Sequence, residues 1–94
     1  MGVQEVFRWT QIGPQQTVDL FLHPYGDNEF ASFSIVPTLA SNVPSAAVQV
    51  KAQLTVGPTH RHVDGVAYSI SVQNKSIGPQ PYIAVRLLEF AQSF

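Results

Sequence analysis

Two histidines at alternate positions form the clearest chemical constellation in the chain. His60 and His62 flank Arg61 in a segment whose side chains alternate as in a strand. Side chains at positions i and i+2 of a strand project from one face, about 6.5 to 7 Å apart along the backbone, so two imidazoles there could share a metal ion. His23 or a carboxylate would have to supply a third ligand. Because the spacing brings neither to the pair, an exposed pair is favoured and no cofactor is predicted.

The His-x-His segment also resembles the metal sites of cupins, which would imply a minimal metal-dependent enzyme. The glutamate expected a few residues downstream is missing, because the chain continues Val63-Asp64-Gly65. The sequence has no cysteine, no Gly-x-Ser-x-Gly elbow and no glycine-rich phosphate loop. We therefore expect a protein without enzymatic activity and keep the cupin-type site as an alternative.

Three aromatic residues are the candidates for binding a ligand. Trp9, Tyr25 and Tyr82 fit an inward-facing stripe less clearly than the other rings do. A flat exposed ring can contact a sugar or another protein, so these residues point to a carbohydrate-binding module as a second alternative. The competing interpretation places the single tryptophan in the core of a small sandwich.

Length, charge and composition limit the class of protein. A chain of 94 residues forms one domain with one core, and we expect residues 1–94 to be that domain. A net charge of −1 without a basic cluster disfavours nucleic acid and anionic membranes as partners. No segment has the features of a signal peptide or a membrane span, so we expect a cytoplasmic or a processed extracellular chain.

One long β-hairpin dominates the middle of the sequence. Its first arm carries apolar residues at every second position from Val48 to Val56, and its return arm repeats the pattern from Val66 to Val72. The dipeptide Asp64-Gly65 favours a tight two-residue turn. This turn predicts four pairs: Val63 with Val66, His62 with Ala67, Arg61 with Tyr68, and His60 with Ser69.

The alternation changes phase once, at Gly57-Pro58. One extra residue must be inserted there, so we predict a β-bulge in an edge strand, since proline removes a ladder donor. Arg61 and Val63 then face inward, with Arg61 buried along the Tyr68 ring. His60 and His62 face water.

Four further strands complete the predicted fold. They span residues 3–10, 17–23, 30–36 and 81–90, and Phe21 suggests that the second is covered on both faces. Pro37 is expected to end the third, and residues 38–45 to form a crossover loop. A helix over residues 83–92 is disfavoured by its β-branched and aromatic content. Six strands without a convincing helix predict an all-β, antiparallel two-sheet sandwich; a small barrel is the alternative.

The last third of the chain resembles bacterial immunoglobulin-like and adhesion-related sandwich modules. The resemblance covers about residues 68–90: an alternating strand ending in Val72-Gln73-Asn74, a turn with Gly78, and an apolar strand from Tyr82 to Leu87. The sequence departs from the pattern at Lys75-Ser76-Ile77 and at two prolines in the turn. The resemblance implies a binding or spacer module. We accordingly expect recognition or assembly through a protein partner or a second copy, with edge or sheet contacts producing a homo-oligomer.

Overall fold

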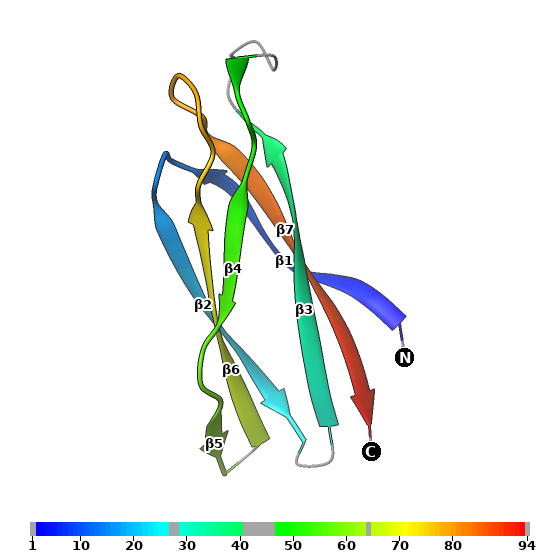
Figure 1. The fold of residues 1–94 in the computed structure, drawn as a ribbon. Helices are drawn as coiled ribbons and strands as arrows, with labels where there is room; N and C mark the ends of the chain where they lie inside the picture. The colour runs from blue at the N-terminus through cyan, green and yellow to red at the C-terminus, as the bar shows by residue number, and fades with distance from the viewer. Residues whose placement is uncertain (1, 27–28, 41–46, 64, 94) are drawn as a thin grey trace.

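The computed structural model describes residues 2–26, 29–40, 47–63 and 65–93, which form seven strands and no α-helix (Figure 1). No helix long and apolar enough to cross a membrane is found there. The strands, in chain order, are β1 (Gly2–Ile12), β2 (Thr17–Tyr25), β3 (Glu29–Leu39), β4 (Ala52–Val56), β5 (His60–His62), β6 (Gly65–Asn74) and β7 (Ile83–Ser93).

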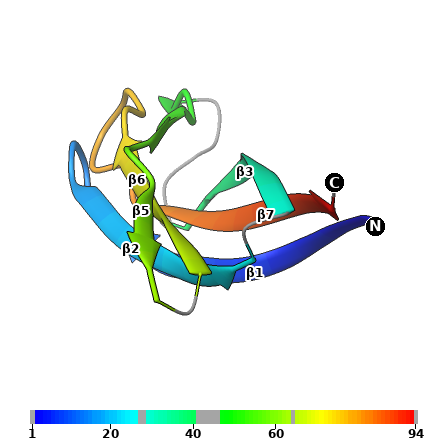
Figure 2. The same ribbon diagram turned by 90° about the horizontal axis from the view of Figure 1, so that it is seen from below.

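The strands form two antiparallel sheets, which confirms the predicted all-β, two-sheet architecture. One sheet has the order β1-β7-β3, and the other has the order β2-β6-β4, with β5 pairing β6 beyond β4. Only the β4-β5-β6 stretch stays within a sheet; every other connection between successive strands crosses to the opposite sheet. Figures 1 and 2 show β1 and β7 running side by side to the two chain ends.

The core lies between the sheets. It consists mainly of the side chains that point inward from the two central strands, β6 and β7. Ile70 and Val72 of β6 face Ile83, Val85 and Leu87 of β7, and all are buried. The two-residue period of a strand explains this pattern, because every second side chain points to the same face. On the outer face of β7, Leu88 and Phe90 are half-buried, so both faces of the last strand are partly covered.

Asn74 closes one end of the sandwich, which we call the closed end (Ile12, Asn74, Ser76 and Pro81). Its buried side-chain amide donates to the carbonyl oxygens of Ile12 at 3.0 Å, Gly13 at 3.0 Å and Pro81 at 2.7 Å. Its Oδ1 accepts from the Ser76 N–H at 3.0 Å. One neutral side chain thereby joins the ends of β1 and β6 to the segment that enters β7.

The predicted bulge at Gly57-Pro58 is confirmed. Val56 pairs with Ile70, and His60 pairs with Ala67, so the three residues 57–59 of the outer segment lie opposite the two residues 68–69 of β6. The extra residue falls between β4 and β5, and both strands lie at the edge of their sheet, as the proline suggested.

The predicted hairpin register is wrong by two residues. His62 pairs with Gly65, Arg61 with Val66 and His60 with Ala67. The register is set from the other end of the hairpin, where Ala52 pairs with Asn74, and one inserted residue then carries it to the turn. The prediction started instead from the preferred turn dipeptide.

Arg61 is not buried, and Val63 does not face the core; both predictions are wrong. Arg61 is exposed in the three-residue strand β5, and Val63 is fully exposed at the hairpin tip. Strand β5 pairs with β6, but the burial along β6 does not continue into β5. His60 is exposed, as predicted.

Several strand limits also differ from the prediction. Pro37 does not end β3 but pairs with Val85 inside it, which an edge strand allows because one side of its backbone needs no donor. Strand β4 begins only at Ala52, and before it Gln49 forms an isolated bridge with Ile77. Phe21 is 63% exposed, so β2 is covered on one face only. Of the predicted crossover loop, residues 38–39 belong to β3 and 41–46 lie outside the described residues.

Candidate functional site

The three histidines lie around one end of β6. His60 is exposed in β5, and its ring meets Phe21 edge-on, with 6.3 Å between ring centroids. The His23 backbone lies in the irregular part of β2, opposite Ala67 of β6. On its other side Ala67 pairs with His60. Strand β6 therefore lies between the His23 and His60 backbones and separates them by roughly 10 Å. The side chains of His23 and His62 lie outside the described set. Within that set no three potential ligands cluster, and metal binding stays a prediction.

The predicted binding residues Trp9, Tyr25 and Tyr82 stand on three different segments. Trp9 in β1 is half-buried against the core and meets Phe7 edge-on, with ring centroids 4.9 Å apart. Tyr82 is half-buried just before β7, where its ring would lie 3.3 Å from a Cβ placed on Gly13. Tyr25, at the end of β2, contacts an ionisable group in the interior.

That ionisable group is Glu89, a carboxylate that is 7% exposed on the inner face of β7. The Tyr25 hydroxyl donates a hydrogen bond to its Oε2. The Gln4 side-chain amide donates to its Oε1 at 3.3 Å. Glu89 lies between Gln4 of β1 and Phe33 of β3 in the sheet register. We call this region the open end of the sandwich (Gly2, Gln4, Tyr25, Glu89 and Ala91).

Aromatic rings hold one side of Glu89. Tyr68 meets Tyr25 and Phe33 edge-on, with ring centroids at 5.0 and 5.4 Å. The Tyr68 hydroxyl accepts a hydrogen bond from the Ala31 N–H at 3.3 Å. Burial first, and then the hydrogen bond to Glu89 and its negative charge, raise the pKa of Tyr25 far above the usual value. Tyr25 is therefore a neutral donor to the carboxylate at physiological pH.

A hollow opens on the other side of Glu89. Its volume is about 310 Å³, and its lining consists of Gly2, Val3, Gln4, Glu89 and Ala91. Of the described residues that line it, Glu89 is the ionisable one. The Glu89 side chain therefore borders a space that the small residues Gly2 and Ala91 also line.

Glu89 was missed from the sequence although a signal was present. It continues the inward series Ile83, Val85 and Leu87 at the same two-residue spacing, so a charged residue on a buried face could have been recognised. Gln4 gave no such signal, because a register shift between Glu5 and Phe7 changes which side chains of β1 face inward.

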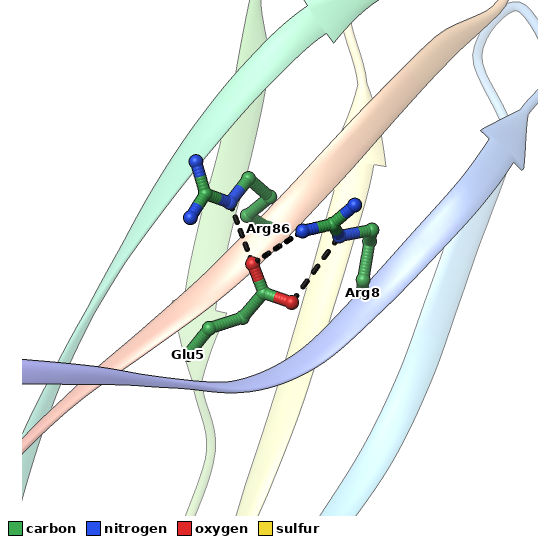
Figure 3. A network of polar contacts seen from close by, with 3 residues as sticks. All are labelled: Glu5, Arg8 and Arg86. Carbon is green, nitrogen blue, oxygen red and sulfur yellow. Dashed lines mark hydrogen bonds and ion pairs between the residues drawn. The ribbon is translucent and has the colours of Figure 1, made fainter.

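A second feature lies on the outer face of the β1-β7-β3 sheet, where two arginines share one carboxylate (Figure 3). Arg8 donates to Glu5 from Nε at 3.2 Å and from a terminal nitrogen at 3.0 Å. Arg86 donates to Glu5 from Nε at 2.5 Å, and its two terminal nitrogens point away (Figure 3). The hydrogen bonds from Arg8 and then Arg86 lower the pKa of Glu5.

Apolar side chains adjoin this charged cluster on the same outer face. Val3 is 65% exposed, and Phe30 and Val36 are each 38% exposed. Leu88 and Phe90 lie half-buried between them on the central strand. The outer face thus combines an apolar stripe with a local excess of one positive charge.

The sheet edges, in contrast, are poorly shaped for pairing with another strand. Strand β1 has two register shifts, β2 has one that contains Pro24, and the β4–β5 edge has the bulge at Gly57-Pro58. In β3, Pro37 has no N–H, and the Ala31 N–H is occupied by Tyr68. Bulges and prolines of this kind hinder edge-to-edge association. The faces of the sheets are therefore better candidates for contact than the edges.

Comparisons of the chain with protein-family models, with curated proteins and with solved structures find no match. Functional inference thus depends on the two arrangements above, the outer face with its arginines and the open end with its buried carboxylate.

Proposed function

We propose that this chain is a non-enzymatic recognition or assembly module that contacts another protein through the outer face of the β1-β7-β3 sheet. The observation that carries the proposal is the apolar stripe of Val3, Phe30 and Val36 beside Arg8 and Arg86. Exposed apolar side chains next to arginine are typical of protein interfaces. The bulged edges direct contact toward this face instead of toward strand addition.

The charge of the face favours a different protein over a second copy. Arg8 and Arg86 are 54% and 50% exposed and share the single carboxylate of Glu5. A second copy would place the same positive excess against itself, whereas an apolar surface bearing a carboxylate would complement it. The terminal nitrogens of Arg86 offer the paired donors that a carboxylate accepts. Self-association remains an outcome that the experiment below distinguishes.

An immunoglobulin-like arrangement is part of the same proposal. In that fold one sheet contains the order B-E-D and the other the order C-F-G. If β2 corresponds to strand B and β3 to strand C, the order β2-β6-β4 corresponds to B-E-D and the order β3-β7-β1 to C-F-G. The chain differs in that β1, from the N-terminal side, occupies the position of the G strand. This supports kinship of architecture with such modules. The carbohydrate alternative has less support at Trp9, because that residue packs against the core.

Site-specific photocrosslinking tests the proposal. A photoreactive residue replaces Val36 on the proposed face or Thr55, an exposed residue on the outer face of the opposite sheet. In the cell that makes the chain, we expect position 36 and not position 55 to capture a partner. The captured protein is then purified, and its affinity is measured for the chain, for Arg86→Glu and for the matched control Lys51→Glu.

The expected result is a loss of about tenfold or more in affinity for Arg86→Glu and less than about twofold for Lys51→Glu. Equal capture at both positions, or equal affinities for the two variants, would contradict the proposed face. Capture of the chain itself, with sedimentation that changes with concentration, would replace the different partner with a second copy.

A further inference from the structure

We infer that the hollow at the open end binds a primary alkylammonium group, such as a lysine side chain presents. This inference concerns the inner face of β1 and β7 and does not depend on contact through the outer face. It is carried by a buried carboxylate that has spare acceptor capacity beside open space.

Among the described residues, the charge of Glu89 is only partly compensated. A carboxylate has about four acceptor positions, and Glu89 receives one hydrogen bond from a phenol and one from an amide. Both donors are neutral. The ion pairs in the described part of the chain involve Glu5 rather than Glu89. A buried charge is stabilised most by an opposite charge, so a cation gains more at this position than at an exposed carboxylate.

The geometry favours an ammonium over a guanidinium group. Tyr25 occupies Oε2, and the remaining oxygen, Oε1, holds the longer bond to Gln4 at 3.3 Å. A guanidinium binds best when both carboxylate oxygens face its planar fork, whereas an ammonium needs only one oxygen. Glu89 and Gln4 both line the hollow, so exchange of the Gln4 hydrogen bond for one from an ammonium would suffice for binding.

The hollow also has room for the alkyl chain. Its volume of about 310 Å³ far exceeds the roughly 15 Å³ that one water requires. Gly2 and Ala91 pair with each other across β1 and β7, and their small size leaves this part of the hollow unfilled. A Cβ built on Gly2 would meet nothing within 4 Å. A linear chain of a few methylene groups can therefore lie across these two residues while its ammonium reaches Glu89.

Titration with n-butylammonium, followed by backbone NMR shifts, tests this site on the whole chain. We expect saturable shifts at Gln4, Glu89 and Ala91 with a Kd on the order of millimolar. Glu89→Gln should weaken binding about tenfold or more. The control Asp19→Asn removes the same charge from an exposed carboxylate bonded to Ser71 and should leave binding unchanged.

A second variant keeps the inference testable if Glu89→Gln alters the fold. Ala91→Leu fills the hollow and leaves the carboxylate in place, so it too should weaken n-butylammonium binding about tenfold, while circular dichroism verifies the folded state. Tetramethylammonium, which cannot donate a hydrogen bond, should bind at least about tenfold more weakly than n-butylammonium. Absence of saturable shifts, equal affinity in Glu89→Gln and Asp19→Asn, or equal binding of the two cations would overturn the inference. None of these outcomes bears on the outer face.

Discussion

The two ends of the sandwich each bury one polar side chain, but they treat it differently. At the closed end, the neutral amide of Asn74 makes four hydrogen bonds to fixed backbone groups. At the open end, the carboxylate of Glu89 makes two, both to side chains, and adjoins a hollow. A neutral group with full hydrogen bonding stabilises the fold, whereas a charged group with spare capacity leaves an interaction for a ligand.

Burial alone does not show whether a polar residue stabilises the fold or binds a ligand. Asn74 lies on the inward face of β6, and Glu89 lies on the inward face of β7. Each is six residues, an even number, from another inward-facing residue of its strand, Tyr68 and Ile83 respectively. What differs is the partner set. We therefore propose that the closed end stabilises the fold and that the open end and the outer face of its sheet bind ligand and partner.

Asn74→Ala should give the largest loss. Three carbonyl groups and one N–H would lose their partner in a buried region, so we expect the free energy of unfolding to fall by about 3 kcal/mol in urea denaturation. The matched control is Gln73→Ala at the neighbouring outward position, with an expected change below about 0.5 kcal/mol. Similar losses in both variants would remove the special role of the closed end.

Glu89→Gln should cost much less, although Glu89 is almost as buried. The amide keeps an acceptor for Tyr25 and removes a charge that costs free energy to bury, so the two effects oppose each other. We expect a change in unfolding free energy within about 1 kcal/mol, of either sign. A loss as large as that of Asn74→Ala would show that both ends are structural and erase the contrast.

Tyr25→Phe sharpens the contrast at alkaline pH. The pKa of Tyr25 is raised in the folded state above the unfolded value of about 10, so its contribution is complete below pH 10. As pH rises from there toward the folded pKa, the unfolded chain loses its proton first and stability falls. We expect Tyr25→Phe to have a flatter decline in melting temperature above about pH 10. Equal slopes in both proteins would place Tyr25 in water instead of beside Glu89.

The smallest expected effect belongs to Glu5→Gln on the outer face. The pKa of Glu5 is lowered in the folded state, so its stabilisation is present above the unfolded pKa and is lost as pH falls through the folded value. Because the ion pairs are exposed, we expect a slight loss at neutral pH that disappears in acid and shrinks in high salt. Melting curves across acidic pH measure it, and a loss that is independent of salt would argue for packing rather than charge.

Local patterns predicted much of the fold. Alternation identified the strands and the two-sheet architecture, and the phase change at Gly57-Pro58 identified the bulge. The predicted register failed because a preferred turn dipeptide does not decide which residues pair. With Ala52 opposite Asn74 and one residue inserted, His62 lies opposite Gly65. The burial of Arg61 failed because alternation predicts which side chains share a face and not whether that face is covered: Arg61 pairs with Val66 but is exposed.

The candidate sites were harder to predict, because they depend on which strands become neighbours. Glu5, Arg8 and Arg86 meet only because β1 pairs with β7 across nearly the whole chain. Gln4 and Tyr25 reach Glu89 from two strands of different sheets. Neither strand order nor the bulge in β1 could be read from local alternation.

Amide hydrogen exchange along β7 tests the central claim, the separation of a stabilising end from a binding end, most directly. Strand β7 is paired on both sides by β1 and β3, so differences along it report local opening and not missing strand partners. We expect the Val85 amide, toward the closed end of β7, to exchange only through global unfolding, and the Ala91 amide to exchange through local opening of lower free energy. We expect n-butylammonium to slow exchange at Ala91 and not at Val85. Equal opening free energies at Val85 and Ala91, unchanged by the cation, would contradict the claim.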